Sequence, residues 1–204
     1  RYGNQAQIGA WNIARLAEAV APLMDDVESL YSVLEHYESK YIEFQNSNWG
    51  DKLGIDDFQE SDETLVIELN DLLLKVETDM TIFFRLLSHL ESPTQEGITH
   101  AFYDSENIPA EEWNEWLDKW WKRVSGKPNR QSMLNANPKY VLRNWMAQLA
   151  IDAAENDDYS ICEELYNLLK NPYEEQPEHD EKWFKKRPEW ARHRVGCSML
   201  SCSS

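Results

Sequence analysis

The residues best suited to covalent chemistry in this sequence are two cysteines near its end, Cys197 and Cys202, in the segment GCSMLSCSS (196–204). A thiolate can attack a disulfide and exchange partners with it, so a thiol in a Ser-rich tail is a candidate redox group. Four residues separate the two cysteines, which is not the spacing of a CxxC redox motif or a zinc knuckle. The third cysteine, Cys162, falls in an apolar helical stripe and is predicted to be buried.

Other motifs for catalysis or ligand binding are missing from the sequence. None of the seven glycines has the spacing of a phosphate-binding loop, and Gly126-Lys127 lacks both the upstream glycine and the Ser/Thr of a P-loop. The five histidines form no HExxH pair. Adjacent acids such as Asp25-Asp26 do not face each other on a helix and are expected to be solvated. The sequence therefore predicts no catalytic, cofactor-binding or metal site in this chain.

One segment is strongly basic: KWFKKRPEWARHR (182–194) carries six Lys or Arg residues and one Glu. Such a segment could reach the phosphates of a nucleotide. Alternatively, its aromatic residues could pack while its cations pair with an acidic helical body, so that it forms a strap. The acidity of the rest of the chain favours the strap.

The elements that position these residues are predicted to be helices, because apolar residues recur at i, i+3, i+4 and i+7 and no segment alternates with a period of two. The sequence predicts helices over 13–34 with a kink at Pro22, over 65–87 as one helix or two, over 109–124, from Pro138 through 153, and over 160–169. Residues 46–63 are predicted to form a loop, with Ser61 as an N-cap. Pro172 should end the last helix before an irregular tail. The predicted fold class is all-α.

Composition limits the classes of partner. A chain of 204 residues with a net charge of −17 is unsuited to neutralising nucleic-acid phosphates and would be repelled by anionic membranes. We find no apolar run of transmembrane length. Three cysteines are too few for a disulfide framework, which favours a reducing compartment. The first residue is Arg1 and no targeting signal follows, so we expect a fragment of a longer protein.

The segments RYGNQAQIGAWNIARLAEAV, DMTIFFRLL, NPKYVLRNWMAQLAIDAAENDDY, LKNPYEEQP and CSMLSCSS, in this order, resemble the C-terminal part of the selenoprotein O family of pseudokinases, which act as protein adenylyltransferases. The most specific segments are NPKYVLRNWMAQ and the closing Ser-Cys-Ser-Ser. This resemblance implies that the chain is the C-terminal helical lobe of a protein-kinase-like fold. Pro172, which should end the last helix, divides the chain into two predicted regions, a helical part over 1–172 and an extended tail over 173–204.

The resemblance further implies an activity for the parent protein. It would transfer AMP from ATP to Ser, Thr or Tyr hydroxyls of protein substrates, with Mg²⁺ or Mn²⁺ as the metal. The nucleotide pocket, the catalytic base and the metal ligands would all lie upstream of Arg1. We therefore expect no ATP or metal to be bound by this chain alone, no transfer activity from it, and the N-terminal catalytic lobe as its partner.

Cys202 matches the position where members of this family carry selenocysteine or cysteine. The resemblance implies that Cys202 is a regulatory thiol whose disulfide partner lies upstream of Arg1, with Cys197 as a second candidate. The family occurs in bacterial cytoplasm and in mitochondria, and cysteine in place of selenocysteine favours the cytoplasm. The alternative function is a stand-alone acidic helical module that binds a basic protein without catalysis.

Overall fold

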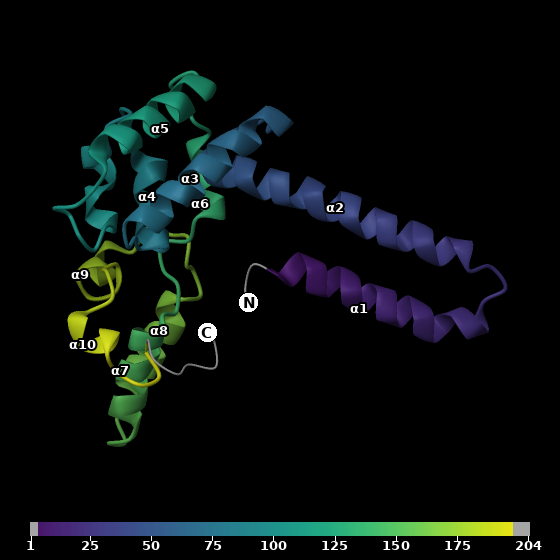
Figure 1. Ribbon diagram of the computed structural model, residues 1–204. Coiled ribbons are helices and arrows are strands. Elements are labelled where there is room, and N and C mark those ends of the chain that lie inside the picture. Colours follow the sequence, from purple (N-terminus) through teal and green to yellow (C-terminus); the bar gives the residue numbers. More distant parts are fainter. Residues whose placement is uncertain (1–3, 198–204) are drawn as a thin grey trace. The chain divides into compact units, whose positions relative to one another are not determined.

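The computed structural model describes residues 4–197, and this part of the chain is helical (Figure 1). Thr78 and Phe102, in extended stretches between the helices, pair at an isolated antiparallel bridge. The predicted all-α fold class is therefore confirmed for the described residues. The chain divides into two compact units, residues 1–48 and residues 49–204, which we call unit 1 and unit 2.

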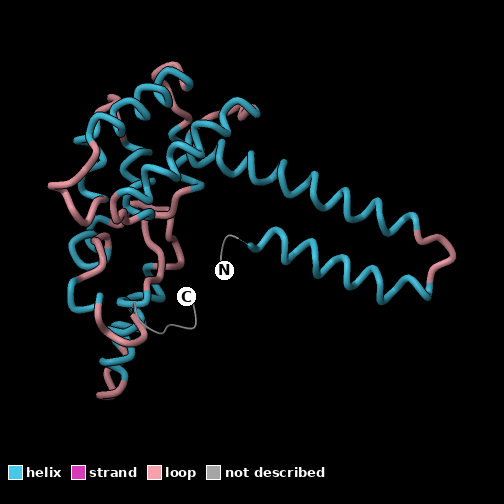
Figure 2. The backbone as a smooth tube through the Cα atoms, viewed as in Figure 1, coloured by secondary structure: helices cyan, strands magenta, loops and turns pink. Residues whose placement is uncertain are grey.

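Unit 1 is a pair of helices. Helix α1 (Gln5–Val20) is followed by the 3-10 turn η2 (Ala21–Leu23) and by α2 (Glu28–Leu53), whose last turn belongs to unit 2. Pro22 lies in η2, where the helix was predicted to kink. The first half of α2 runs back alongside α1 (Figure 2), and the Tyr37 hydroxyl donates a hydrogen bond to the Ala6 carbonyl (3.4 Å).

The predicted loop over 46–63 is wrong in its first half, because α2 continues to Leu53. Leu53 is completely buried and Trp49 packs on the same core one turn earlier. This apolar spacing outweighs the weak helix propensity of the intervening polar residues and Gly50. The helix ends at Gly54, whose φ of +67° is left-handed.

The first core of unit 2 is formed by α3 (Glu63–Lys75), α4 (Met80–His89), η4 (Gln95–Ala101), α5 (Ala110–Arg123) and α6 (Arg130–Ala136). Helix α5 contributes three buried tryptophans, Trp113, Trp116 and Trp120. The indole N–H groups of Trp116 and Trp120 donate to the carbonyls of Leu65 and Leu53, each at 2.8 Å. These bonds let polar indole atoms lie in an apolar core.

The segment 65–87 proves to be two helices, α3 and α4, separated by extended residues. Asp79 caps α4 by accepting a hydrogen bond from the Ile82 N–H (3.1 Å). The predicted N-cap at Ser61 is wrong. Gln59 and Asp62 form a capping box around the short turn η3 (Glu60–Asp62) instead.

The second core of unit 2 lies where α7 (Asn144–Ala154) and α8 (Ser160–Leu168) meet the C-terminal turns η5 (Pro177–His179), α9 (Asp180–Trp183) and α10 (Glu189–Arg192). The helix predicted to start at Pro138 begins only at Asn144. The Asn137 side chain does not cap it, because that side chain bonds to Lys52 through both its oxygen and its nitrogen (3.0 Å each).

Residues 173–197, which we call the tail segment, follow α8 and contain short helical turns. Trp183, Ala191 and Cys197 of this segment are buried in the second core. The division of the chain into regions at residue 172 stays a prediction.

Candidate functional site

The tail segment is held on unit 2 by aromatic packing. Trp183 is buried and lies on Trp145 of α7, with ring centroids 5.9 Å apart. Its indole N–H donates to a carboxylate oxygen of Glu164 on α8 (2.8 Å). These contacts fix the start of the basic stretch on α7 and α8.

The arginines of that stretch are paired with carboxylates of unit 2. Arg187 and Arg192 both bind Glu77, at 2.7 and 2.9 Å. Arg194 binds Asp152 on α7 at 2.6 Å. The prediction that the basic segment forms a strap is confirmed, and its arginines already have acidic partners within the chain.

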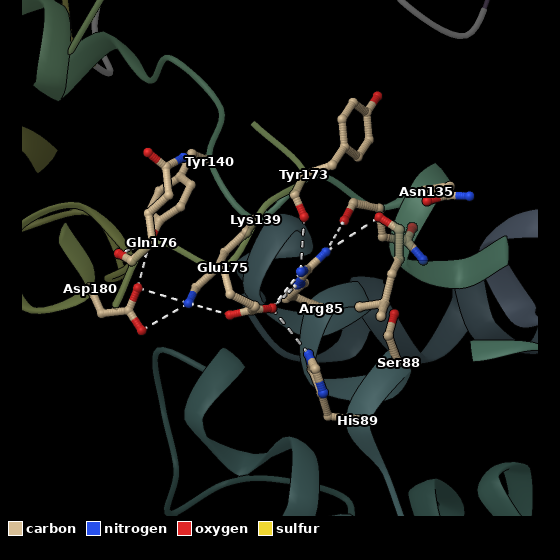
Figure 3. Close-up of polar contacts among 12 residues, drawn as sticks. Arg85, Ser88, His89, Asn135, Lys139, Tyr140, Tyr173, Glu175, Gln176 and Asp180 are labelled. Carbon is tan, nitrogen blue, oxygen red and sulfur yellow. Dashed lines mark hydrogen bonds and ion pairs between the residues drawn. The ribbon is translucent and has the colours of Figure 1, made fainter. Parts of the chain in front are cut away.

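A second set of charges lies deeper, and we call it the anchoring network: Arg85, Lys139, Tyr140, Glu175 and Asp180 (Figure 3). The side chains of Arg85 and Lys139 are only 3% and 5% exposed. Glu175 lies between them, accepting from the Arg85 guanidinium and from the Lys139 ammonium (2.6 Å). Asp180 accepts from Lys139 on its other side (2.8 Å). The network therefore joins α4 to the tail segment through buried cations.

Backbone carbonyls complete the surroundings of the Arg85 guanidinium. It donates to the carbonyls of Leu134 (3.3 Å), Asn137 (3.1 Å) and Tyr173 (3.0 Å). One side chain thus satisfies acceptors from the end of α6, from the loop after it and from the tail segment. A planar guanidinium with five N–H donors suits this geometry, whereas an ammonium could not reach all of these acceptors.

The electrostatics of the network fix the protonation of its members. Burial alone would raise the pKa of Glu175, but the hydrogen bonds and charges of Lys139 and Arg85 outweigh burial and lower it to about 2. Burial, together with the hydrogen bond to Asp180, raises the pKa of Tyr140 far above its usual value. At neutral pH Glu175 is therefore an anion and Tyr140 a neutral hydrogen-bond donor.

Glu175→Gln is expected to make unfolding less dependent on acid. The folded pKa of Glu175 lies below its ordinary value of 4.5, so its stabilising contribution is complete above pH 4.5 and is lost as the pH falls toward 2. The full shift corresponds to about 3 kcal/mol, and solvent screening of this half-exposed side chain reduces the contribution to about 1–2 kcal/mol.

Urea unfolding at neutral pH and near pH 3 measures this effect. The Gln variant should be less stable than the wild type at neutral pH and closer to it in acid. Glu174→Gln, at the neighbouring exposed position, is the matched control and should behave as the wild type. An acid dependence unchanged in the Glu175 variant would contradict the assignment.

A polar pocket of about 300 Å³ lies beside Asp79 and Arg143, and Cys197 and Tyr103 also line it. The Arg143 guanidinium binds Asp79 through two N–H groups, one of them at 2.8 Å from Oδ1. Burial raises the pKa of Tyr103, whose hydroxyl accepts a hydrogen bond from the Arg187 N–H (2.9 Å). This pocket brings a thiol-bearing residue close to an ion pair.

The residues around this pocket do not fit a nucleotide. Phosphoryl and nucleotidyl transfer need cations directed at the phosphates and carboxylates that hold a metal. Here Arg143 is neutralised by Asp79, while Arg187 and Arg192 share Glu77. Within residues 4–197, no cluster of three or more His, Cys, Asp or Glu side chains could hold a metal ion.

The cysteines differ in their placement. Cys202 lies outside the described residues. Cys197 is 7% exposed, and its carbonyl accepts a hydrogen bond from the Asn144 side chain (3.4 Å). The prediction that Cys162 is buried is wrong: Cys162 is exposed, because Ile161, Leu165 and Leu168 form the face of α8 that packs on the second core. The structure places neither Cys162 nor Cys197 in a disulfide.

No helix within residues 4–197 has both the length and the apolar character that a bilayer crossing requires.

Comparison with known proteins relates the chain to one family. A family model described as "Protein adenylyltransferase SelO" matches residues 1–170. A protein nucleotidyltransferase YdiU from Flavobacterium johnsoniae is 45% identical over all of this chain. Proteins of the same name from Aromatoleum aromaticum and Rhodopirellula baltica are 42% and 41% identical over all of the chain. The chain spans 40–42% of the length of these relatives.

Proposed function

This chain belongs to the SelO family of protein adenylyltransferases, and on that basis we propose that it forms the C-terminal part of an enzyme that transfers AMP from ATP to Ser, Thr or Tyr hydroxyls of proteins. The observation that carries the proposal is the match of the family model over residues 1–170. ATP and Mg²⁺ or Mn²⁺ would bind in the part of the enzyme outside this chain.

Within the enzyme, the described residues would act as a support for the catalytic lobe. The anchoring network and the strap hold the tail segment on the helical body through ion pairs. That attachment would fix the position of Cys197, the last residue that the structure describes. Cys202 would then be a regulatory thiol at the end of the chain, in the cytoplasm.

The regulatory step would be thiol–disulfide exchange. The Cys202 thiolate attacks one sulfur of a disulfide, a new S–S bond forms, and the other sulfur leaves as a thiolate, so the exchange involves no net oxidation. Oxidised glutathione is a suitable probe. Its effect on the longer protein should disappear in the Cys202→Ser variant and persist in the Cys162→Ser variant.

Labelled ATP tests the proposed activity. The longer protein that contains this chain should transfer label from ATP marked at the α-phosphate to protein in the presence of Mg²⁺ or Mn²⁺. The same protein should transfer none from ATP marked at the γ-phosphate, and the 204-residue chain alone should transfer neither label.

Each other result has a distinct meaning. Label from γ-marked ATP would identify phosphoryl transfer and overturn the proposal. Transfer of AMP by the 204-residue chain alone would show that the catalytic groups lie within it. Absence of transfer from both proteins would favour the acidic interaction module.

A further inference from the structure

Unit 1 has no core of its own. None of the described residues up to Asn48 is buried, and the first buried residues of α2 are Gly50 and Leu53 in unit 2. The two helices approach closely at Gly9, where a Cβ would come within 2.2 Å of the Tyr37 hydroxyl. A close pair of helices whose side chains are at most partly buried has little of the apolar packing that stabilises helices in proteins.

Unit 1 also exposes large apolar side chains. Trp11 is 58% exposed on α1, and Phe44 is 62% exposed on α2. Seven further large apolar side chains of unit 1 are also exposed: Ile8, Leu16, Leu23, Tyr31, Val33, Tyr41 and Ile42. We call this set the unit 1 apolar surface. Tyr31 and Val33 are two positions apart on α2 and do not share a face, so these side chains lie on more than one side of the helix pair. Large apolar side chains exposed in this number indicate that a partner covers unit 1 from more than one side.

Part of this surface is hollowed. Tyr37, Tyr41 and Phe44 lie on one side of α2, at spacings of four and three residues, and together with Lys40, Gln45 and Asn48 they line a depression of about 330 Å³. Aromatic walls with a polar rim suit the insertion of an apolar side chain from another segment. The depression therefore points to a protein partner with a protruding apolar residue.

We infer that the unit 1 apolar surface docks against the part of the family's polypeptide that lies outside this chain. The inference rests on the proposed function and adds the surface that joins the two parts of the enzyme. The chain spans only 41% of its relative from Flavobacterium johnsoniae, so more than half of such a polypeptide is available as the occupant. The family match starts at residue 1, so α1 belongs to the conserved fold of the family rather than to an added arm.

A second copy of the chain is a poorer occupant. Each copy carries a net charge of −17, and bringing two such chains together costs electrostatic repulsion. An anionic membrane is disfavoured for the same reason. The covalently linked remainder of the polypeptide needs no such association, because its effective concentration at unit 1 is high.

Amide hydrogen exchange measures the docking directly. In the 204-residue chain, amides of residues 4–48 should exchange fast, because helices without buried contacts open locally at little cost. In the longer protein the same amides should exchange slower by about 100-fold or more. Amides of α5, buried in unit 2 in either case, should exchange at similar rates in both proteins.

Two substitutions make the test specific. Trp11→Glu and Phe44→Glu, combined in the longer protein, should restore fast exchange in residues 4–48. Leu74→Glu, at a side chain of α3 that is 85% exposed in unit 2, is the matched control and should leave exchange unchanged. Protection that persists in the double variant would overturn the inference.

The remaining outcomes separate the two proposals. Slow exchange in the 204-residue chain that depends on its concentration would assign the surface to a second copy and overturn the inference. Protection in the longer protein without any AMP transfer would support the docking surface while the proposed activity fails. AMP transfer by a longer protein whose residues 4–48 exchange fast would support the activity and overturn the docking.

Discussion

Replacement of Arg85 by methionine is expected to lower the free energy of unfolding by about 3–5 kcal/mol. Methionine fills similar space but donates no hydrogen bonds. The variant would leave the carbonyls of Leu134, Asn137 and Tyr173 without this donor and would remove a buried partner of Glu175. Buried acceptors left without a donor are among the most destabilising changes known in proteins. The lost ion pair adds to this cost, although the Glu175 side chain is half-exposed.

Urea unfolding followed by far-ultraviolet circular dichroism measures this loss. Arg194→Met is the matched control, because Arg194 also pairs with a carboxylate but is 42% exposed. It should cost less than about 1 kcal/mol. Equal losses in the two variants would show that burial of the Arg85 guanidinium has no energetic consequence.

Replacement of Trp116 by alanine is expected to destabilise unit 2 by about 3–5 kcal/mol. Trp116 is 1% exposed, and its ring stacks on that of Trp120 with an interplanar angle of 3°. Alanine would leave a cavity in the first core and remove the hydrogen bond to the Leu65 carbonyl. Trp116→Phe keeps much of the ring volume and should cost less.

The midpoint and slope of urea unfolding would report this change. Trp190→Ala, which truncates a tryptophan that is 43% exposed in the same unit, serves as control and should cost less than about 1 kcal/mol. If the two alanine variants unfolded at the same urea concentration, Trp116 could not be part of a well-packed core.

Strong helical periodicity predicted the fold well. The tryptophans of α5 recur on one face, and the helix lies where they indicate, from Ala110 to Arg123. Local polar motifs predicted the starts of the helices less well. Asn137-Pro138 looks like a helix start, but the Asn137 side chain binds Lys52, which is 85 residues away in the sequence. Nothing in the sequence around Asn137 marks this tertiary contact, and the prediction that Asn137 caps a helix was therefore wrong.

The anchoring network shows the same limit. Arg85 interrupts the apolar run FFRLL, and a single charge on an apolar helical face is a local signal for a buried cation. Its partner Glu175 is one of 37 acidic residues, and nothing near Glu175 in the sequence marks it as the one that binds Arg85. Residue chemistry therefore predicts that a partner is needed, whereas the fold decides which acid supplies it.

The distance between Arg85 and Glu175 along the chain also affects how the protein is made. The two residues are 90 positions apart. At about 5–20 residues per second, the ribosome adds Glu175 about 5–20 s after Arg85. Throughout that interval the guanidinium of a nascent chain has only water and carbonyl groups as partners. The first core can therefore collapse early, but its buried charge is neutralised only when the tail segment emerges, so residues synthesised much later complete the fold.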